Sequence, residues 1–383
     1  MSKRNEMTEL LKKLISIDSS NAFLTPGSPG EYEVLRYIQN YMDESGVSAC
    51  QEDTGDGHKN LIATLAGSGG GRPITLYAHT DTVGYAAWKD TALKAEVKGD
   101  ELIGLGACDD KGHCAAMMLA CRELAAQKNR LRGDVHFAFV ADEEGESCGS
   151  FAYVKAHAPE AALILESSPL HEINICHQGF GWLDIIVKGK AGHGSATDSA
   201  DAIARMGEVI VRLSRNQREM FAKTPHPLNG ETVYHTGTVN GGSDYATYPD
   251  LCKLGIEIGT QPGESIGDRI REIEEIFDEV REIYPDLEAR AETVIARSPF
   301  ETKGTEELFR IVSEEIEEAL GVKTKAVGAN SWGDAQIFQD AGFPTLGMGA
   351  LGGNLHSPGE WVSLVQLEQL TNVLISIIKR YCG

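Results

Sequence analysis

The stretch ITLYAHTDTV, residues 74–83, begins as an apolar run and ends in His79 and Asp81. The run predicts a buried strand, and side chains alternate along a strand, so those of His79 and Asp81 face the same way. His79 could therefore bind a metal ion while Asp81 holds its ring from behind, as carboxylates do around many metal-bound histidines. A polar strand end without any chemistry fits these two residues equally well. The sequence on either side of the stretch must decide between the two.

Helical and strand patterns alternate around this stretch. The predicted helices lie near residues 5–16, 31–45 and 112–127, and further strands at 60–65, 135–144 and 162–168. This alternation predicts an α/β fold with a mostly parallel sheet flanked by helices. In such sheets, binding and catalytic residues gather at the carboxyl ends of the strands. His79 lies at such an end.

The order of the elements changes after residue 177. The predicted elements are a strand at 182–190, a helix at 199–221, strands at 232–240 and 253–260, a helix at 264–283 and a strand at 288–296. This β-α-β-β-α-β order predicts an inserted ferredoxin-like α+β domain. The first pattern then resumes and ends in a helix at 363–381. We therefore expect one domain in two parts, residues 1–177 and 296–383, interrupted by a second domain at 178–295.

Charge restricts the class of partner. The chain has 383 residues and a formal net charge of −22, and a surface this acidic repels nucleic acids and anionic membranes. The first twenty residues lack the apolar segment of a signal peptide, and no later apolar run is long enough to cross a bilayer. We expect a cytoplasmic protein that acts on small molecules and binds neither nucleic acid nor membranes.

The segment GLGACDDKGHC, residues 104–114, contains two cysteines, two aspartates and a histidine. Zinc–thiolate sites usually use two close cysteine pairs or a cysteine pair with a histidine pair, and the eight cysteines of this chain form no such pair. We expect Cys108, Cys114 and His113 not to be ligands. One carboxylate can instead bridge two cations about 3.5–4 Å apart, which makes Asp109 the candidate. Asp110 could cap the following helix.

Four more acidic or imidazole side chains follow strands or lie in glycine-rich turns. In FAFVADEEGESCGS, residues 137–150, the neighbours Glu143 and Glu144 point in different directions, so one could bind metal while the other acts as a base. Glu166 ends the strand at 162–168, and His356 lies in GGNLHSPGEW. Each alone is unremarkable, as a charged loop or a structural histidine. Together, two imidazoles and three carboxylates suit Zn²⁺, with Co²⁺ or Mn²⁺ as substitutes.

Six segments in order, AHTDTV, GLGACDDKG, DEEGES, LILESS, GKAGHGS and HSPGEW, resemble the motifs of a zinc metallopeptidase family. That family includes acetylornithine deacetylase, succinyl-diaminopimelate desuccinylase, aminoacylase and glutamate carboxypeptidase. The resemblance implies a zinc-peptidase-like catalytic domain, an inserted lid or dimerisation domain, a homodimer and two Zn²⁺ ions per subunit.

The resemblance also implies a role for each matched residue. Asp109 would bridge the two metals, with His79 and Glu166 on one metal and Glu144 and His356 on the other. Asp81 would orient His79. Glu143 would be the general base that takes a proton from the attacking water and delivers it to the leaving amine. His193, in the inserted domain, would help to bind the oxyanion, often from the partner subunit of a dimer.

The sequence departs from the family at positions that hold a substrate carboxylate. Gly259 stands where many relatives have an arginine, and Ala246 where they have an asparagine; Asp201 and Ala78 are further departures. Either another cation, such as Arg205 or Lys253, replaces the arginine, or the substrate lacks that carboxylate. The expected function is hydrolysis of an N-acyl amino acid, similar to acetylornithine deacetylase. The alternatives are a di- or tripeptidase or carboxypeptidase on the same scaffold, and a non-catalytic binding relative.

Overall fold

The computed structural model describes residues 2–127, 131–220 and 225–383. The chain folds into two compact units, and the second is inserted in the sequence of the first. The first unit comprises Met1–Ile175, Thr302–Ala326 and Gly333–Gly383, and the second comprises Cys176–Glu301 and Val327–Trp332.

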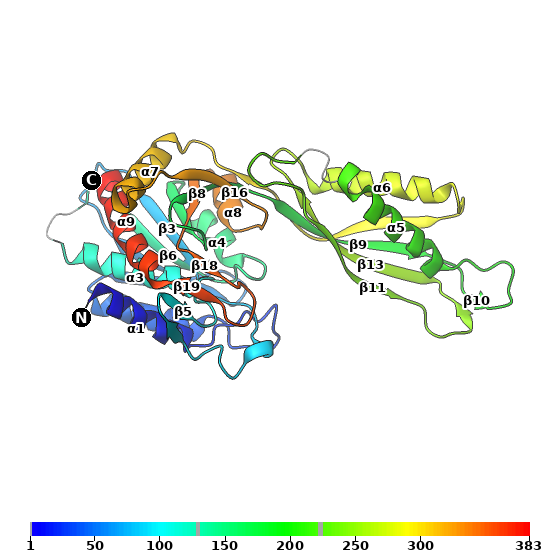
Figure 1. Cartoon of the computed structure of the whole chain (residues 1–383), viewed down its shortest axis with the longest axis horizontal. Helices are drawn as coiled ribbons and strands as arrows, with labels where there is room; N and C mark the ends of the chain where they lie inside the picture. Colours follow the sequence, from blue (N-terminus) through cyan, green and yellow to red (C-terminus); the bar gives the residue numbers. More distant parts are fainter. Residues whose placement is uncertain (1, 128–130, 221–224) are drawn as a thin grey trace. The chain divides into compact units, whose positions relative to one another are not determined.

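A large sheet forms the centre of the first unit (Figure 1). Its order is β1-β2-β6-β3-β7-β17-β8-β15, and β16 also pairs with β8. The bounds are β1 (Ser48–Asp53), β2 (Lys59–Leu65), β3 (Ile74–His79), β6 (Val135–Val140), β7 (Ala161–Leu165), β8 (Glu172–His177), β15 (Phe300–Glu301), β16 (Lys325–Ala329) and β17 (Thr345–Met348). The central pairs β6–β3, β3–β7 and β7–β17 are parallel. The predicted α/β class is confirmed.

Helices cover both faces of this sheet. Their bounds are α1 (Lys3–Ile15), α2 (Tyr32–Glu44), α3 (Lys111–Ala125), α4 (Cys148–Ala156), α7 (Glu306–Leu320), α8 (Ala335–Asp340) and α9 (Leu364–Cys382). On one face α3 packs against α1, α9 and β3, and almost all of its side chains are buried. On the other face Tyr77 of β3 meets Phe338 of α8, with ring centroids 5.5 Å apart. Strand β3 is therefore buried from both sides, as its apolar sequence predicted.

A smaller antiparallel sheet lies beside the large one, with the order β18-β19-β5-β4. Its strands are β4 (Glu96–Lys98), β5 (Glu101–Ile103), β18 (Gly352–Gly353) and β19 (Trp361–Ser363), and a short 3₁₀ helix, Ala86–Trp88, precedes them in the chain. This sheet pairs two distant parts of the sequence, because β19 lies next to β5. It thereby holds the segment that contains His356 near the loop that contains Asp109.

The second unit has the predicted β-α-β-β-α-β order. Its main strands are β9 (Gly179–Lys188), β11 (Tyr234–Gly241), β13 (Leu251–Thr260) and β14 (Glu288–Arg297), its helices are α5 (Ala202–Met220) and α6 (Ile266–Arg281), and β10 (Gly192–His193) pairs with β12 (Thr247–Tyr248). Alternate side chains of β9 are buried against the two helices in one apolar core. Residue 221, the last of the predicted helix, lies outside the described residues. None of the described helices combines the length and apolar composition of a membrane span.

Candidate metal centre

Asp109 lies between two imidazoles in the first unit. His79, fully buried at the carboxyl end of β3, places its Nε2 atom 2.8 Å from Oδ1 of Asp109. His356, in the loop before β19, places its Nε2 atom 3.1 Å from Oδ2 of the same carboxylate. The two oxygens of Asp109 therefore face two different histidines, as a bridging carboxylate between two cations would.

Each histidine is accompanied by a second carboxylate. Oε2 of Glu144, in the loop after β6, lies 3.2 Å from Nε2 of His356. Oε1 of Glu166, directly after β7, lies 3.9 Å from Nε2 of His79. Ligand atoms of His79, Asp109 and Glu144 all lie within 4.8 Å of one another. The structure thus brings all five predicted ligands close to one another around Asp109. Their division between two cations stays a prediction.

Glu360 holds the loop that carries Asp109. Its carboxylate accepts hydrogen bonds from the backbone N–H groups of Gly106 at 2.9 Å, Cys108 at 2.9 Å and Asp109 at 3.1 Å. Gly106 has a φ of 74°, a conformation that glycine adopts without strain. Sequence reasoning missed Glu360, although its place in the HSPGEW segment is a signal that could have found it.

Asp81 contacts both the ring of His79 and the loop that carries Glu143. Nδ1 of His79 lies 3.1 Å from the carbonyl oxygen of Asp81 and 3.4 Å from its Oδ1 atom. The same carboxylate accepts the backbone N–H groups of Glu143 at 3.1 Å and Glu144 at 3.0 Å. Asp81 thus supports a ligand on one side and positions the acidic loop on the other.

Asn21 is a further buried residue of this network. Its amide donates to Oδ2 of Asp81 at 2.8 Å and to Oδ1 of Asp142 at 2.9 Å. It therefore joins the segment after β3 to the segment after β6. Nothing in the sequence distinguished Asn21, because it lies far from the motifs and a lone asparagine between two helices is ordinary.

The electrostatics of the centre favour a cation. Burial raises the pKa of Glu144, and the neighbouring Asp109 adds to this effect; burial likewise raises the pKa of Glu166. Hydrogen bonds to Asp109 and Glu144 raise the pKa of His356 to about 10. Within the described chain, Oε1 of Glu144 is buried without a hydrogen-bond partner. Crowded carboxylates, two imidazoles and an unsatisfied oxygen fit divalent cations, whose charge would offset that of the acids.

The thiols and the third histidine near this centre have structural partners. Cys114 donates to the backbone carbonyl of His79, with Sγ 3.1 Å from the oxygen. His113 pairs through Nδ1 with Asp110 and accepts the N–H of Ala350 at Nε2, 3.0 Å away. Sγ of Cys108 lies 4.0 Å from the carbonyl oxygen of Gly353. These three residues are absent from the clusters of metal-ligand atoms found among the described residues.

Asp110 does not cap the helix through its side chain. It occupies the position before α3 but makes no side-chain capping hydrogen bond. Its Oδ2 atom instead accepts the backbone N–H of His79 at 3.0 Å. The carboxylate therefore joins the end of β3 to His113 in the first turn of α3.

The remaining predicted residue, His193, lies in the second unit. It is exposed on β10, and its Nδ1 atom lies 2.9 Å from the hydroxyl of Ser195. Its role in binding the oxyanion stays a prediction.

Both cations named as replacements for the missing arginine already have acidic partners in the second unit. Arg205 is largely buried and pairs with Asp286 at 2.7 Å, and Lys253 pairs with Asp184 at 2.6 Å. At Gly259 a Cβ atom would lie 2.5 Å from Oε1 of Gln178. The amide of Gln178 thus occupies the space beside residue 259, where the family's arginine would start.

The sequence model of peptidase family M20/M25/M40 matches residues 75–380 of this chain. This chain belongs to that family. The match covers β3, the Asp109 loop, the acidic loop and the His356 segment, so the resemblance drawn from the motifs is confirmed. As a member of the family, the chain is a metal-dependent hydrolase that acts on C–N amide bonds.

Two curated relatives and one solved structure illustrate the range of the family. The chain is 27% identical to an acetylornithine deacetylase from Myxococcus xanthus, over 97% of each protein. It is 26% identical to an N-formyl-4-amino-5-aminomethyl-2-methylpyrimidine deformylase from Halalkalibacterium halodurans, covering 99% of this chain and 95% of the relative. Its fold is similar to that of a dinuclear metal-binding M20 peptidase from Bacillus subtilis, with a TM-score of 0.76, 17% identity and coverage of 99% and 98%.

Proposed function

We propose that this hydrolase removes the acyl group from an N-acyl amino acid, with two Zn²⁺ ions at the centre and Glu143 as general base. The observation that carries the proposal is the carboxylate of Asp109, whose oxygens lie 2.8 Å and 3.1 Å from two imidazoles that each have a further carboxylate beside them. One cation would be held by His79, Asp109 and Glu166, and the other by Asp109, Glu144 and His356. Mixed nitrogen and oxygen donors suit Zn²⁺, and Co²⁺ or Mn²⁺ are compatible.

The bound cations would supply Lewis acidity for the amide carbonyl and would lower the pKa of water. The chain's own residues would move the protons. Glu143 would accept a proton from water on its carboxylate and then donate it to the departing nitrogen. Its backbone N–H is held by Asp81 at 3.1 Å, so the base and the support of His79 share one anchor. His193 would donate a hydrogen bond to the carbonyl oxygen as negative charge develops there.

The surroundings of Gly259 bear on the substrate. Gln178 is neutral, and its side chain is committed to the backbone, accepting from the N–H of Val233 at 3.1 Å and donating to the carbonyl of Glu231 at 2.8 Å. Arg205 and Lys253 already pair with acidic side chains. Neither therefore replaces the arginine that binds a substrate carboxylate in many relatives. The deformylase relative is named for a formylated pyrimidine, a compound without a carboxylic acid. Acylated amines without a carboxylate therefore belong among the candidate substrates.

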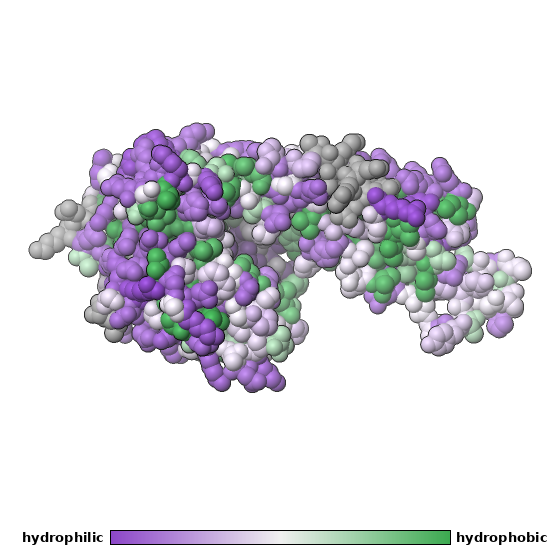
Figure 2. All heavy atoms as spheres, viewed as in Figure 1, coloured by the Kyte–Doolittle hydropathy of each residue, from purple (hydrophilic) through white to green (hydrophobic). Residues whose placement is uncertain are grey.

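We also propose a homodimer formed through the second unit. Apolar side chains gather over α5 (Figure 2), where Ile203 and Val211 are 47% and 41% exposed. Strand β11 lies at the edge of its sheet, and within the described residues its only strand partner is β13. Exposed apolar patches and free strand edges are typical of subunit interfaces. A cytoplasmic location stays a prediction.

A substrate panel tests the proposed activity. Purified protein loaded with Zn²⁺ would be offered N-acetyl and N-formyl amino acids, the matching acylated amines without a carboxylate, dipeptides and tripeptides, with release of free amine as the measurement. We expect the acylated compounds to be cleaved with the higher kcat/KM. A preference for dipeptides or tripeptides would replace the deacylase with a peptidase. Turnover of none of them by the metal-loaded protein would favour the binding relative. The Glu143→Gln variant is the control for contaminating hydrolases.

A further inference from the structure

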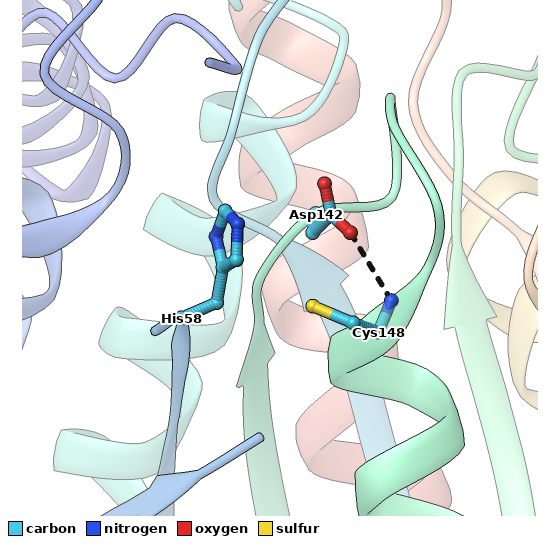
Figure 3. Close-up of side chains that lie close together, drawn as sticks. All are labelled: His58, Asp142 and Cys148. Carbon is cyan, nitrogen blue, oxygen red and sulfur yellow. Dashed lines mark hydrogen bonds between the residues drawn. The ribbon is translucent and has the colours of Figure 1, made fainter. Parts of the chain in front are cut away.

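A second cluster of side chains that offer metal-ligand atoms lies in the first unit, and two of its members flank Glu143 and Glu144 in the sequence. It comprises His58, just before β2, Asp142, just after β6, and Cys148, the first residue of α4 (Figure 3). Ligand atoms of these three residues lie within 4.8 Å of one another. We propose that this cluster binds a third divalent cation, Zn²⁺, through the imidazole of His58, the carboxylate of Asp142 and the thiolate of Cys148.

The donor set suits zinc. Nitrogen, oxygen and sulfur ligands together are typical of Zn²⁺, whereas hard cations such as Mg²⁺ and Ca²⁺ select oxygen alone. A thiol that binds zinc gives up its proton, which passes to solvent, so the carboxylate of Asp142 and the thiolate of Cys148 together balance the two positive charges. This cluster, unlike the centre around Asp109, offers sulfur.

Glu31 prepares His58 for this role. Its two carboxylate oxygens lie 3.0 Å and 3.2 Å from Nδ1 of His58. Because Glu31 engages Nδ1, Nε2 is the nitrogen left for a cation, and Figure 3 shows the imidazole facing Asp142 and Cys148. A carboxylate behind a ligating histidine is the common support in zinc sites. Oε1 of Glu31 also accepts the backbone N–H of Asp142 at 3.2 Å, which ties two of the ligands to one residue.

Asp142 retains capacity for a cation. Its Oδ1 atom accepts one hydrogen bond, from Asn21 at 2.9 Å, and its Oδ2 atom accepts two, from the N–H groups of Glu146 and Cys148 at 3.2 Å each. A carboxylate has about four acceptor positions, so one position on Oδ1 is left. A pocket of about 190 Å³, lined by Glu31, Tyr32, Gly57 and His58 among others, reaches the imidazole. The pocket therefore gives access to the His58 side of the cluster.

Such an ion would fix the acidic loop at both ends. Asp142 and Cys148 bracket the loop, and the catalytic candidates Glu143 and Glu144 lie between them. The carbonyl of Asp142 already accepts the N–H of Ser147 at 2.7 Å, so the loop closes on itself. One cation shared with His58 would attach this closed loop to the start of β2. The site is therefore a structural metal site that positions the base, separate from the two catalytic cations.

Cobalt titration tests the proposal without relying on activity. Metal-free protein would be titrated with Co²⁺, which gives a thiolate-to-metal charge-transfer absorption only when a cysteine is a ligand. We expect three Co²⁺ ions per chain and this absorption band. Cys148→Ser should lose the band and one ion, and His58→Ala should lose one ion and the band. The double variant Cys108→Ser with Cys114→Ser is the matched control and should keep both.

The unmodified protein alone can overturn the inference: saturation with Co²⁺ without the band would exclude a thiolate ligand. A band that survives in folded Cys148→Ser, or disappears in the control variant, would also contradict it. If one of the two site variants does not fold, as judged by circular dichroism, the other decides. Failure of the catalytic proposal gives a different result. If the centre around Asp109 binds no metal, the protein would bind one Co²⁺ ion per chain. The band would still appear, because only the cluster of His58, Asp142 and Cys148 has a sulfur ligand.

Discussion

Glu143 and Glu144 are neighbours in sequence with different surroundings. Glu144 faces His356. Burial raises the pKa of Glu143, with the charge of His79 opposing this effect and those of Asp334 and Glu166 adding to it. Both backbone N–H groups are held by the single carboxylate of Asp81. A ligand and a base can therefore come from consecutive residues, because the loop is fixed and the side chains diverge.

The role of Glu143 leads to the first prediction. Glu143→Gln should keep the metal content of the protein and lower kcat by about 10²–10⁴-fold, since a positioned base contributes about that much. Metal analysis and steady-state kinetics on the same preparation check both parts. Glu146→Gln, an exposed change in the same loop, is the control and should keep normal turnover. Unchanged turnover in Glu143→Gln would refute the base assignment.

Asn21 leads to a second prediction. Asn21→Ala removes one donor from each of two buried carboxylates, Asp81 and Asp142, and should lower the free energy of unfolding by about 1–3 kcal/mol. Asn21→Asp should cost more, because it places a third carboxylate beside the two. Urea unfolding measures both. The exposed change Asn5→Ala should stay within about 0.5 kcal/mol of the unmodified protein. Equal stability of Asn21→Ala would mean that the network does not depend on this amide.

These residues also show how much of the candidate site can be predicted from the sequence. His79, Asp109, Glu144, Glu166 and His356 could be predicted because each lies in a short motif at a strand end or glycine-rich turn. Asn21 could not be assigned in the same way, because it lies outside the motifs and its contacts are with residues far away in the chain. Glu360 lies in the HSPGEW motif, but its hydrogen bonds to the Asp109 loop could not be predicted from that position. Long-range contacts of single polar residues leave no periodic trace in sequence.

At the level of elements, the strands that carry the site were predicted well and the small sheet was not. Strand β3 gives six consecutive buried residues, a strong signal. The strands β4, β5 and β19 have three residues each, too short for any periodicity to show. Yet this small sheet places His356 beside Asp109. The position of the second group of ligands therefore required the structure.

Strand β13 carries the third prediction. In Gly259→Ala the new Cβ would collide with Gln178, whose amide is held by two backbone partners and cannot easily move, so the free energy of unfolding should fall by about 1–3 kcal/mol. Gly267→Ala, in the first turn of α6, meets atoms only at 3.5 Å and beyond and should be neutral or stabilising by up to about 1 kcal/mol. Urea unfolding of both variants provides the comparison. Equal stabilities would show that the space beside residue 259 is not filled.

At the scale of the whole molecule, the predicted metal ligands lie in the first unit and His193 lies in the second. The fourth prediction concerns this division. His193→Ala should keep the metal content and lower kcat, because the carbonyl oxygen would lose a hydrogen-bond donor. Lys188→Ala, an exposed change at the end of β9 in the same unit, is the control and should be silent. Normal turnover of His193→Ala would mean that the second unit does not complete the site.

Mixing variants tests whether His193 acts across a dimer. Glu143→Gln and His193→Ala would be unfolded or dissociated together and reassembled. A mixed dimer then contains one site with both native residues if His193 serves the other copy, so activity should reappear. If each chain uses its own His193, every site keeps one defect and the mixture stays as inactive as its parts.

The most direct test of the central claim is the anomalous scattering of zinc in crystals of the metal-loaded enzyme. The account predicts two peaks about 3.5–4 Å apart with Asp109 between them. One should lie about 2.0–2.2 Å from ligand atoms of His79 and Glu166, and the other at the same distance from those of Glu144 and His356. No peak at these residues, or two peaks that do not share Asp109, would contradict it.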